Sequence, residues 1–342
     1  MRVLLDTTYA LRAPFSGTAV YLERLAEALA AGGEIEVIEV ADRRRRAPAG
    51  GGLGSIRNLL RDRWWAAVEL PRLARRARAD VVHHPLPAHA RGMGAPQVIT
   101  VMDLSFERLP ECFDPRFRIY ARRTHRAAAR ASAAVICISR TTADDVRELW
   151  GVPQERIVLA PHGPGQGLAR RERERTHLLY VGDDEPRKNV PALLEAYRLY
   201  RERAGDPHPL VLAGSATASG PGISVERHPN RERLADLYSG AVALIHPSLY
   251  EGFGFTAVEA MSTGTPVVAA RSPGVEEVCG EAASYADPRD PASIAAAIAE
   301  LVSSPELRRE LAERGRRRAG WFSWDSCARA HATAYSLAHA RA

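Results

Sequence analysis

Cysteine is scarce in this chain of 342 residues, with four copies scattered from position 112 to position 327. They form no Cys-x-x-Cys pair, so the sequence indicates neither a disulfide framework nor a zinc site. Asp183 and Asp184 are adjacent acids, but no third ligand follows at a spacing that suits a cation. We therefore expect no metal ion and no bound cofactor.

Long apolar runs are absent as well. No stretch of about 18 apolar residues occurs, which is the length that a transmembrane helix needs. The chain reaches an acid at Asp6, and such a start is not typical of a secretory signal. We expect a cytoplasmic protein, with attachment to the inner face of the membrane as the alternative.

The composition is ordinary in its apolar content and basic in its charge. Hydrophobic residues make up 46% of the chain, which is enough for two cores at this length. The formal net charge is +6. An arginine-rich composition on solvated faces explains it simply; a positive field for a phosphate-bearing substrate or an anionic membrane is the alternative. No nucleic-acid-binding motif is present, so we expect no nucleic-acid partner.

Short apolar runs alternate with helical patterns in both halves of the chain. Val3–Leu5 is typical of a buried parallel strand, and helical spacing follows it up to Gly32-Gly33. The segment 163–177 has three glycines, a proline and a run of charges, which is typical of a linker. The alternation restarts at Leu178. These patterns predict two doubly wound α/β domains with a ligand cleft between their strand ends.

The expected boundaries follow from these changes in pattern. We expect residues 1–165 to form an N-terminal Rossmann-like domain and residues 166–176 to form the linker. Residues 177–322 are expected to form a C-terminal Rossmann-like domain, and residues 323–342 a last helix.

The segment 241–259 has the features of an anion site. An apolar strand leads into Glu251, and Gly252-Phe253-Gly254 lets the backbone approach a ligand closely. A helix then begins near Thr256, and its unpaired amides and dipole favour a diphosphate. Glu259 falls in the first turn or so of this helix, where its carboxylate can accept two hydrogen bonds from a ribose diol.

A second strand, turn and helix start lies at Tyr180–Asn189 (YVGDDEPRKN). It places Arg187 and Lys188 at a helix N-terminus, where cations are unfavourable unless an anion lies between them. Arginine offers forked donors and lysine a point charge, and both suit phosphate oxygens. Exposed basic residues on a turn are the alternative interpretation.

Taken together, these motifs resemble the C-terminal domain of the retaining family-four glycosyltransferases of group 1, which have the GT-B fold. The matching segments are Tyr180–Asn189, His246–Gly254 (HPSLYEGFG), the E-x7-E pair Glu251/Glu259, Glu259–Val268 (EAMSTGTPVV) and Phe322–Trp324 (FSW). The N-terminal half resembles the family more loosely, through Ser16–Tyr21, Val98–Phe106 and Pro161–Gly163.

The resemblance implies two facing Rossmann-like domains and transfer of a sugar from a nucleoside diphosphate sugar to an acceptor hydroxyl. It also implies that the domain 1–165 binds the acceptor, that the domain 177–322 binds the donor, and that the last helix, 323–342, packs back toward the N-terminal domain. Retention of the anomeric configuration and independence of a metal ion are part of that expectation. The resemblance implies catalytic roles for Glu251 at the donor sugar and Lys188 at the diphosphate. The other expected donor contacts are Arg187, Gly17, Phe253, Gly254, Phe255, Thr256 and Glu259.

One departure lies in the N-terminal half. The family usually has His-Asp where this chain has Met102-Asp103, and a thioether cannot donate a hydrogen bond. A non-catalytic sugar-nucleotide-binding protein and a GT-B-fold sugar-nucleotide epimerase are the alternatives to a transferase.

The sequence leaves the acceptor unidentified, as either a small molecule or a lipid-linked glycan. The basic region 57–78, with Trp64-Trp65, either lies on a membrane surface or packs its aromatic side chains on its own domain.

Overall fold

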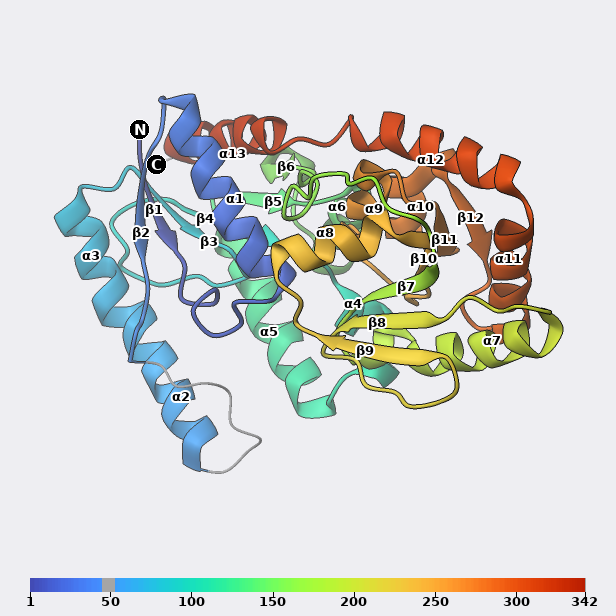
Figure 1. Ribbon diagram of the computed structural model, residues 1–342. Helices are drawn as coiled ribbons and strands as arrows, with labels where there is room; N and C mark the ends of the chain where they lie inside the picture. The colour runs from blue at the N-terminus through green and yellow to red at the C-terminus, as the bar shows by residue number, and fades with distance from the viewer. Residues whose placement is uncertain (45–52, 342) are drawn as a thin grey trace. The chain divides into compact units, whose positions relative to one another are not determined.

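Two six-stranded sheets, each made of parallel strands and flanked by helices, form the framework of the chain (Figure 1). The computed structural model describes residues 1–44 and 53–341. It divides into two units. Unit 1 comprises Met1–Leu104, Arg116–Pro161 and Trp324–Ala342, and unit 2 comprises Ser105–Pro115 and His162–Ser323. The expectation of an α/β protein built from two Rossmann-like domains is confirmed.

The sheet of unit 1 has the strand order β2-β1-β3-β4-β5-β6, and every neighbouring pair is parallel. Its central strands β3, β4 and β5 are buried along their whole length, as their continuous apolar runs predict. The strands are β1 Arg2–Asp6, β2 Glu36–Val40, β3 Val81–His84, β4 Gln97–Val101, β5 Ala134–Cys137 and β6 Ile157–Leu159.

The first helix of unit 1, α1, begins and ends at recognisable caps. The side chain of Ser16 accepts a hydrogen bond from the Ala19 amide at the start of α1, and Gly33 ends this helix in the left-handed conformation. The helices of unit 1 are α1 Gly17–Gly32, α2 Leu53–Trp64, α3 Leu70–Ala77, α5 Pro115–Ala131, α6 Arg140–Trp150 and α13 Trp324–His339.

Two local features of unit 1 concern the boundaries of its helices. The helical region 56–78 does not break at Pro71, which lies in the first turn of α3, where a missing amide proton costs nothing. A short π-helical segment, Trp65–Glu69, interrupts the region before it. The cap of α6 is Ser139, which accepts from the Thr142 amide, and not the threonines that follow it.

The sheet of unit 2 has the order β12-β11-β10-β7-β8-β9 and is also parallel throughout. Its strands are β7 His177–Gly182, β8 Leu210–Gly214, β9 Ile223–Arg227, β10 Ala241–His246, β11 Val267–Ala270 and β12 Ala283–Ala286. Its helices are α4 Ser105–Arg108, α7 Val190–Arg203, α8 Arg231–Ser239, α9 Phe255–Thr263, α10 Pro273–Cys279, α11 Pro291–Ser303 and α12 Pro305–Ala319.

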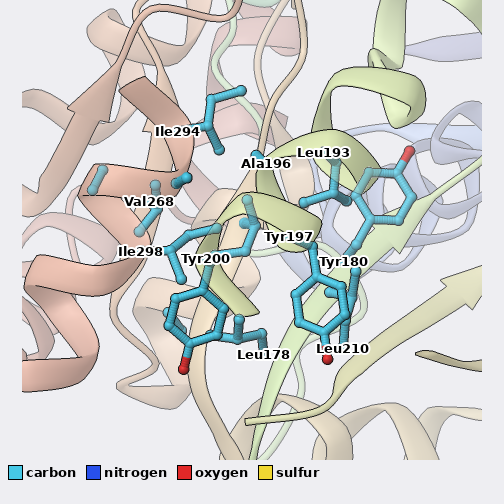
Figure 2. Close-up of a cluster of buried hydrophobic side chains, with 14 of the residues drawn as sticks. Leu178, Tyr180, Leu193, Ala196, Tyr197, Tyr200, Leu210, Val268, Ile294 and Ile298 are labelled. Carbon is cyan, nitrogen blue, oxygen red and sulfur yellow. The ribbon is translucent and has the colours of Figure 1, made fainter. Parts of the chain in front are cut away.

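The core of unit 2 lies between its sheet and the pair α7 and α11, which pack on one another. Figure 2 shows Tyr197 and Tyr200 of α7 among the side chains of this layer, with Leu178 from β7 and Ile298 from α11. These side chains are almost completely buried. The strands β7 and β10 are central, adjacent and parallel, so their carboxyl ends lie at the same edge of the sheet.

No helix in the described part of the chain is long and apolar enough to cross a membrane. The last helix, α13, packs instead on α1 and on strands β3 to β6. It carries His331, which is completely buried. The Nδ1 atom of His331 lies 2.8 Å from the Cys327 carbonyl, so Nδ1 donates there and Nε2 is left to accept from the Tyr21 hydroxyl at 2.8 Å.

The same chain of hydrogen bonds continues into the sheet. The Tyr21 oxygen accepts from the Thr100 hydroxyl at 2.9 Å, and the Thr100 oxygen accepts from Nε2 of His83 at 2.8 Å. Nδ1 of His83 then accepts from the Tyr335 hydroxyl of α13 at 2.9 Å. One set of proton positions thus satisfies every group, with both histidines neutral.

Acid should therefore destabilise this protein. Burial lowers the pKa of His331 from 6.5 to about 4 and that of His83 well below 6.5. The unfolded chain therefore binds more protons than the folded one below pH 6.5. The contribution of these neutral histidines to the free energy of unfolding is fully present above pH 6.5 and is lost as the pH falls toward 4. For His331 alone the loss is on the order of 3 kcal/mol.

Denaturant unfolding between these pH values measures the effect. His331→Gln should flatten the pH dependence by about one proton. His339→Gln, at the exposed end of the same helix, should leave the dependence unchanged. A slope that is the same in all three proteins would contradict the assignment.

Candidate functional site

A buried carboxylate and two cations meet where β7 and β10 end. The Nζ atom of Lys188 lies 2.7 Å from Oε1 of Glu251, and Nη1 of Arg187 lies 3.2 Å from Oε2. Only 6% of Glu251 is exposed. Nε of Arg187 also pairs with Glu185 at 2.9 Å. The structure thus brings together three of the residues that the sequence assigns to the site.

The cations decide the charge of the carboxylate. Burial by itself raises the pKa of Glu251, but the positive charges of Lys188 and Arg187 outweigh burial and hold this pKa well below its usual range. His246 lies at the end of β10, with Nε2 3.8 Å from Oε1 of Glu251. Burial lowers the pKa of His246 to about 4, so it is neutral at pH 7. Glu251 is therefore ionised and counterbalanced by the two cations.

The backbone holds the basic turn against the loop that follows β10. Asn189 has a left-handed conformation, and its side-chain amide donates to the carbonyls of Pro247 and Pro288 at 3.1 and 2.6 Å. The Leu249 amide donates to the Arg187 carbonyl at 2.9 Å. The two cations are therefore positioned by hydrogen bonds of the turn as well as by Glu251.

The helix α9 begins directly after Glu251. Its cap is Gly254, at a φ of 93°, a conformation that side chains rarely adopt. Phe255 stacks on the ring of His162 at 4.8 Å between centroids, and Phe253 meets the same ring edge-on at 5.5 Å. Thr256 is half-buried beside them. Aromatic packing thus fixes the start of a helix whose first amides have no partner within the helix.

Glu259 lies in the second turn of α9 and is buried. Its Oε1 accepts from the Gln166 amide at 3.0 Å, and its Oε2 accepts from the Tyr238 hydroxyl at 2.9 Å. Burial raises its pKa, which these two donors oppose. A Cβ atom placed on Gly165 would lie 1.9 Å from Oε1, so the segment passes the carboxylate closely because it is glycine. This carboxylate is oriented before any ligand arrives.

Sequence reasoning missed several of these partners. Tyr238 ends a helix and Gln166 contributes only a backbone amide, so neither carries a sequence signal. His246 lies within a recognised motif but was given no role. Asp183 accepts from the Ser215 hydroxyl at 2.6 Å, which accounts for one of the paired acids as part of a turn.

Two further predicted features lie in unit 1. Gly17 is the first residue of α1, next to the cap Ser16. Met102 directly follows β4, and its carbonyl accepts from the Thr142 hydroxyl at 3.3 Å. Neither belongs to the unit that holds Glu251, so the expected contact of Gly17 with a donor stays a prediction.

The fold of the chain is shared with solved structures. Sucrose-phosphate synthase from Thermosynechococcus elongatus aligns over 100% of both chains with a TM-score of 0.77 and 19% identity. Anabaena HepE in complex with UDP-glucose aligns over 98% of this chain and 99% of that chain, with a TM-score of 0.72 and 16% identity. These likenesses establish the fold class as GT-B.

Sequence comparison supplies the family. A model described as glycosyl transferases group 1 matches residues 169–318, and one described as glycosyltransferase family 4 matches residues 15–164. O-antigen chain mannosyltransferase B of Escherichia coli is 30% identical over 268 residues, which are 70% of each chain. The chain therefore belongs to the group 1, family 4 glycosyltransferases.

The close approach of Gly165 to Glu259 can be tested. Gly165→Ala would push the Glu259 carboxylate out of its place, so we expect a loss of about 1–3 kcal/mol in stability and several-fold weaker nucleotide binding. Gly205→Ala is the matched control, because its added Cβ would meet nothing within 4 Å. Thermal unfolding with and without nucleoside diphosphates measures both effects. Nucleotide binding equal to that of the unmodified chain would show that Glu259 has no part in it.

Proposed function

We propose that this glycosyltransferase moves a hexose from a nucleoside diphosphate sugar to an acceptor hydroxyl, with retention of configuration and without a metal ion. The observation that carries the proposal is the pairing of Lys188 and Arg187 with Glu251 next to the start of α9. Two cations and a helix N-terminus form a site for a diphosphate.

The chemistry explains why positive charge is needed there. Breaking the bond between the anomeric carbon and the phosphate oxygen leaves positive charge on the sugar and negative charge on the diphosphate. Lys188 and Arg187 would stabilise the negative charge of the leaving diphosphate. In this proposal the two side chains do so without a metal ion. Without donor, the carboxylate of Glu251 pairs with both cations; with donor, this carboxylate would turn to the hydroxyls of the sugar.

The composition of the chain supports a specific role for Lys188. Lysine occurs once in 342 residues, at this position, and the other 46 of the 47 basic residues are arginine. Every other Lys or Arg position in the chain is an arginine, yet position 188 has an ammonium group. Lysine provides a compact point charge, whereas arginine presents a wide planar fork, so the two are not interchangeable in a narrow site.

We propose that the anomeric configuration is retained through a front-face reaction. The acceptor oxygen forms its bond to the anomeric carbon on the side from which the diphosphate leaves, and the hydroxyl proton passes to the departing phosphate oxygen. Glu251 is held by two cations, which makes it a poor nucleophile, so we propose no covalent intermediate on it.

The identity of the donor follows less directly. The Escherichia coli relative is a mannosyltransferase, and the Anabaena structure contains UDP-glucose. Both point to hexose donors. Glu259, oriented by Gln166 and Tyr238, would accept hydrogen bonds from the ribose hydroxyls. A thermal-shift screen over nucleoside diphosphate mannose and glucose would select the donor, because binding stabilises the folded state.

Replacing Lys188 tests the proposal. With the selected donor, Lys188→Ala should lower transfer by about 100-fold or more, because the leaving diphosphate loses a positioned cation. Lys188→Arg keeps the charge and should still be impaired, since the fork has a different shape. Arg198→Ala, an exposed arginine of α7, is the control and should retain full activity.

Product analysis separates the alternatives. Mass spectrometry of the acceptor measures transfer. Binding of donor without any product would indicate a non-catalytic protein, and a changed sugar without acceptor would indicate an epimerase. Normal turnover by Lys188→Ala would refute the assignment of the diphosphate site.

Met102 gives a second test in the other unit. Met102→His introduces a hydrogen-bond donor directly after β4, where the family has one, so we expect a changed rate or donor preference. Kinetics with two nucleotide sugars, together with the melting temperature, measure the change. If rate and preference both match those of the unmodified protein, position 102 does not contact the donor.

A further inference from the structure

The helix α5, Pro115–Ala131, is the most one-sided in charge of the helices in the described chain. Its sequence PRFRIYARRTHRAAARA has six arginines and no aspartate or glutamate. It follows β4 and leads into β5, so its first turns lie beyond the carboxyl ends of the strands of unit 1. In Figure 1, α5 and α2 both extend to the same side of the strands of this unit.

An arginine-rich composition does not by itself explain α5. The helix α12 is also rich in arginine, but several of its arginines form an ion pair with a glutamate one turn earlier in the helix. These pairs are Arg309–Glu306, Arg314–Glu310 and Arg317–Glu313. Helix α7 pairs Arg198 with two glutamates in the same way. Ion pairs within a helix are thus usual for the arginines of these helices, whereas the sequence of α5 contains no acidic residue that could form one.

Apolar side chains are exposed among these arginines. The exposed fractions are 56% for Ile119, 52% for Tyr120 and 43% for Phe117. The buried residues of α5 are alanines at 121, 128 and 129. At 100° per residue, Ile119, Arg123 and Arg126 lie on the opposite face. Both arginines are exposed. The outer face of α5 therefore mixes cations with apolar groups.

The region 57–78 contributes less than its sequence indicates. Arg61 forms ion pairs with Asp42 and Glu69, and Trp65 is buried with its indole donating to Asp6 at 2.9 Å. In α2, Leu60 and Trp64 remain exposed, at 63% and 51%. The apolar surface of unit 1 thus includes the start of α5 and part of α2.

We propose that the outer face of α5, with Ile119, Tyr120, Arg123 and Arg126, rests on the surface of an anionic phospholipid bilayer. Helices that lie in the membrane interface combine arginine with apolar and aromatic groups in this way, with the cations at the headgroups and the apolar groups among the acyl chains. The charge of α5 complements an anionic surface. This proposal does not depend on the donor or on the reaction.

Vesicle sedimentation with the full chain tests the surface. The protein should bind vesicles of phosphatidylcholine with about 30% phosphatidylglycerol, bind pure phosphatidylcholine weakly, and lose most of its binding in about 0.5 M salt. Arg123→Glu with Arg126→Glu should weaken binding by about tenfold or more. Ile119→Ser with Tyr120→Ser should reduce the small part of the vesicle binding that remains at high salt, because this part comes from apolar side chains.

The matched control is Arg309→Glu with Arg317→Glu, which makes the same change of charge on α12. It should bind vesicles within about twofold of the unmodified protein. Equal loss in the control would show that net charge alone is responsible, and no binding to anionic vesicles would overturn the proposal. Tighter binding to a single-stranded oligonucleotide than to vesicles would assign the face to nucleic acid. Unchanged melting temperatures and unchanged transfer to a water-soluble acceptor separate these results from loss of fold or of the proposed function.

Discussion

The ion pair between the buried Glu251 and its two cations is the interaction on which the site of unit 2 depends. A buried carboxylate is unfavourable without a partner, and so is each cation beside a helix N-terminus. Because β7 and β10 are neighbours, the turn after one strand delivers Lys188 and the loop after the other delivers Glu251 to the same place. In the absence of a ligand the three charges stabilise one another, so the order of the strands in the sheet determines where the site forms.

The central part of both sheets could be predicted from the sequence, because continuous apolar runs occur only where strands are covered on both faces. The strands β6, β9 and β12, at the edges of the sheets, escaped prediction, since their residues are partly exposed and show no such run. The meeting of Arg187, Lys188 and Glu251 follows from two strand ends in one parallel sheet. The partners of Glu259 do not, because a backbone amide 93 residues away leaves no mark in the pattern.

Unit 1 shows a different use of buried polar groups. Its last helix, α13, comes from the far end of the chain, and Tyr335 of that helix meets His83 of β3 across 252 residues. This bond belongs to the chain of hydrogen bonds that continues through Thr100 and Tyr21 to His331, and each group in the chain donates in the same direction. This arrangement selects neutral histidines and one orientation of the helix. The core of unit 1 therefore cannot close until α13 is present, and all of unit 2 precedes this helix in the sequence.

The single lysine also has a consequence for covalent chemistry. Among the side chains of this sequence, an amine-reactive acylating reagent can find a single primary amine, the ε-amine of Lys188. The side chain of Lys188 is 18% exposed, and its Nζ atom lies 2.7 Å from Oε1 of Glu251. An adduct on a side-chain amine thus marks the site that holds Glu251. Labelling of this protein by common amine reagents is therefore site-selective without any engineering.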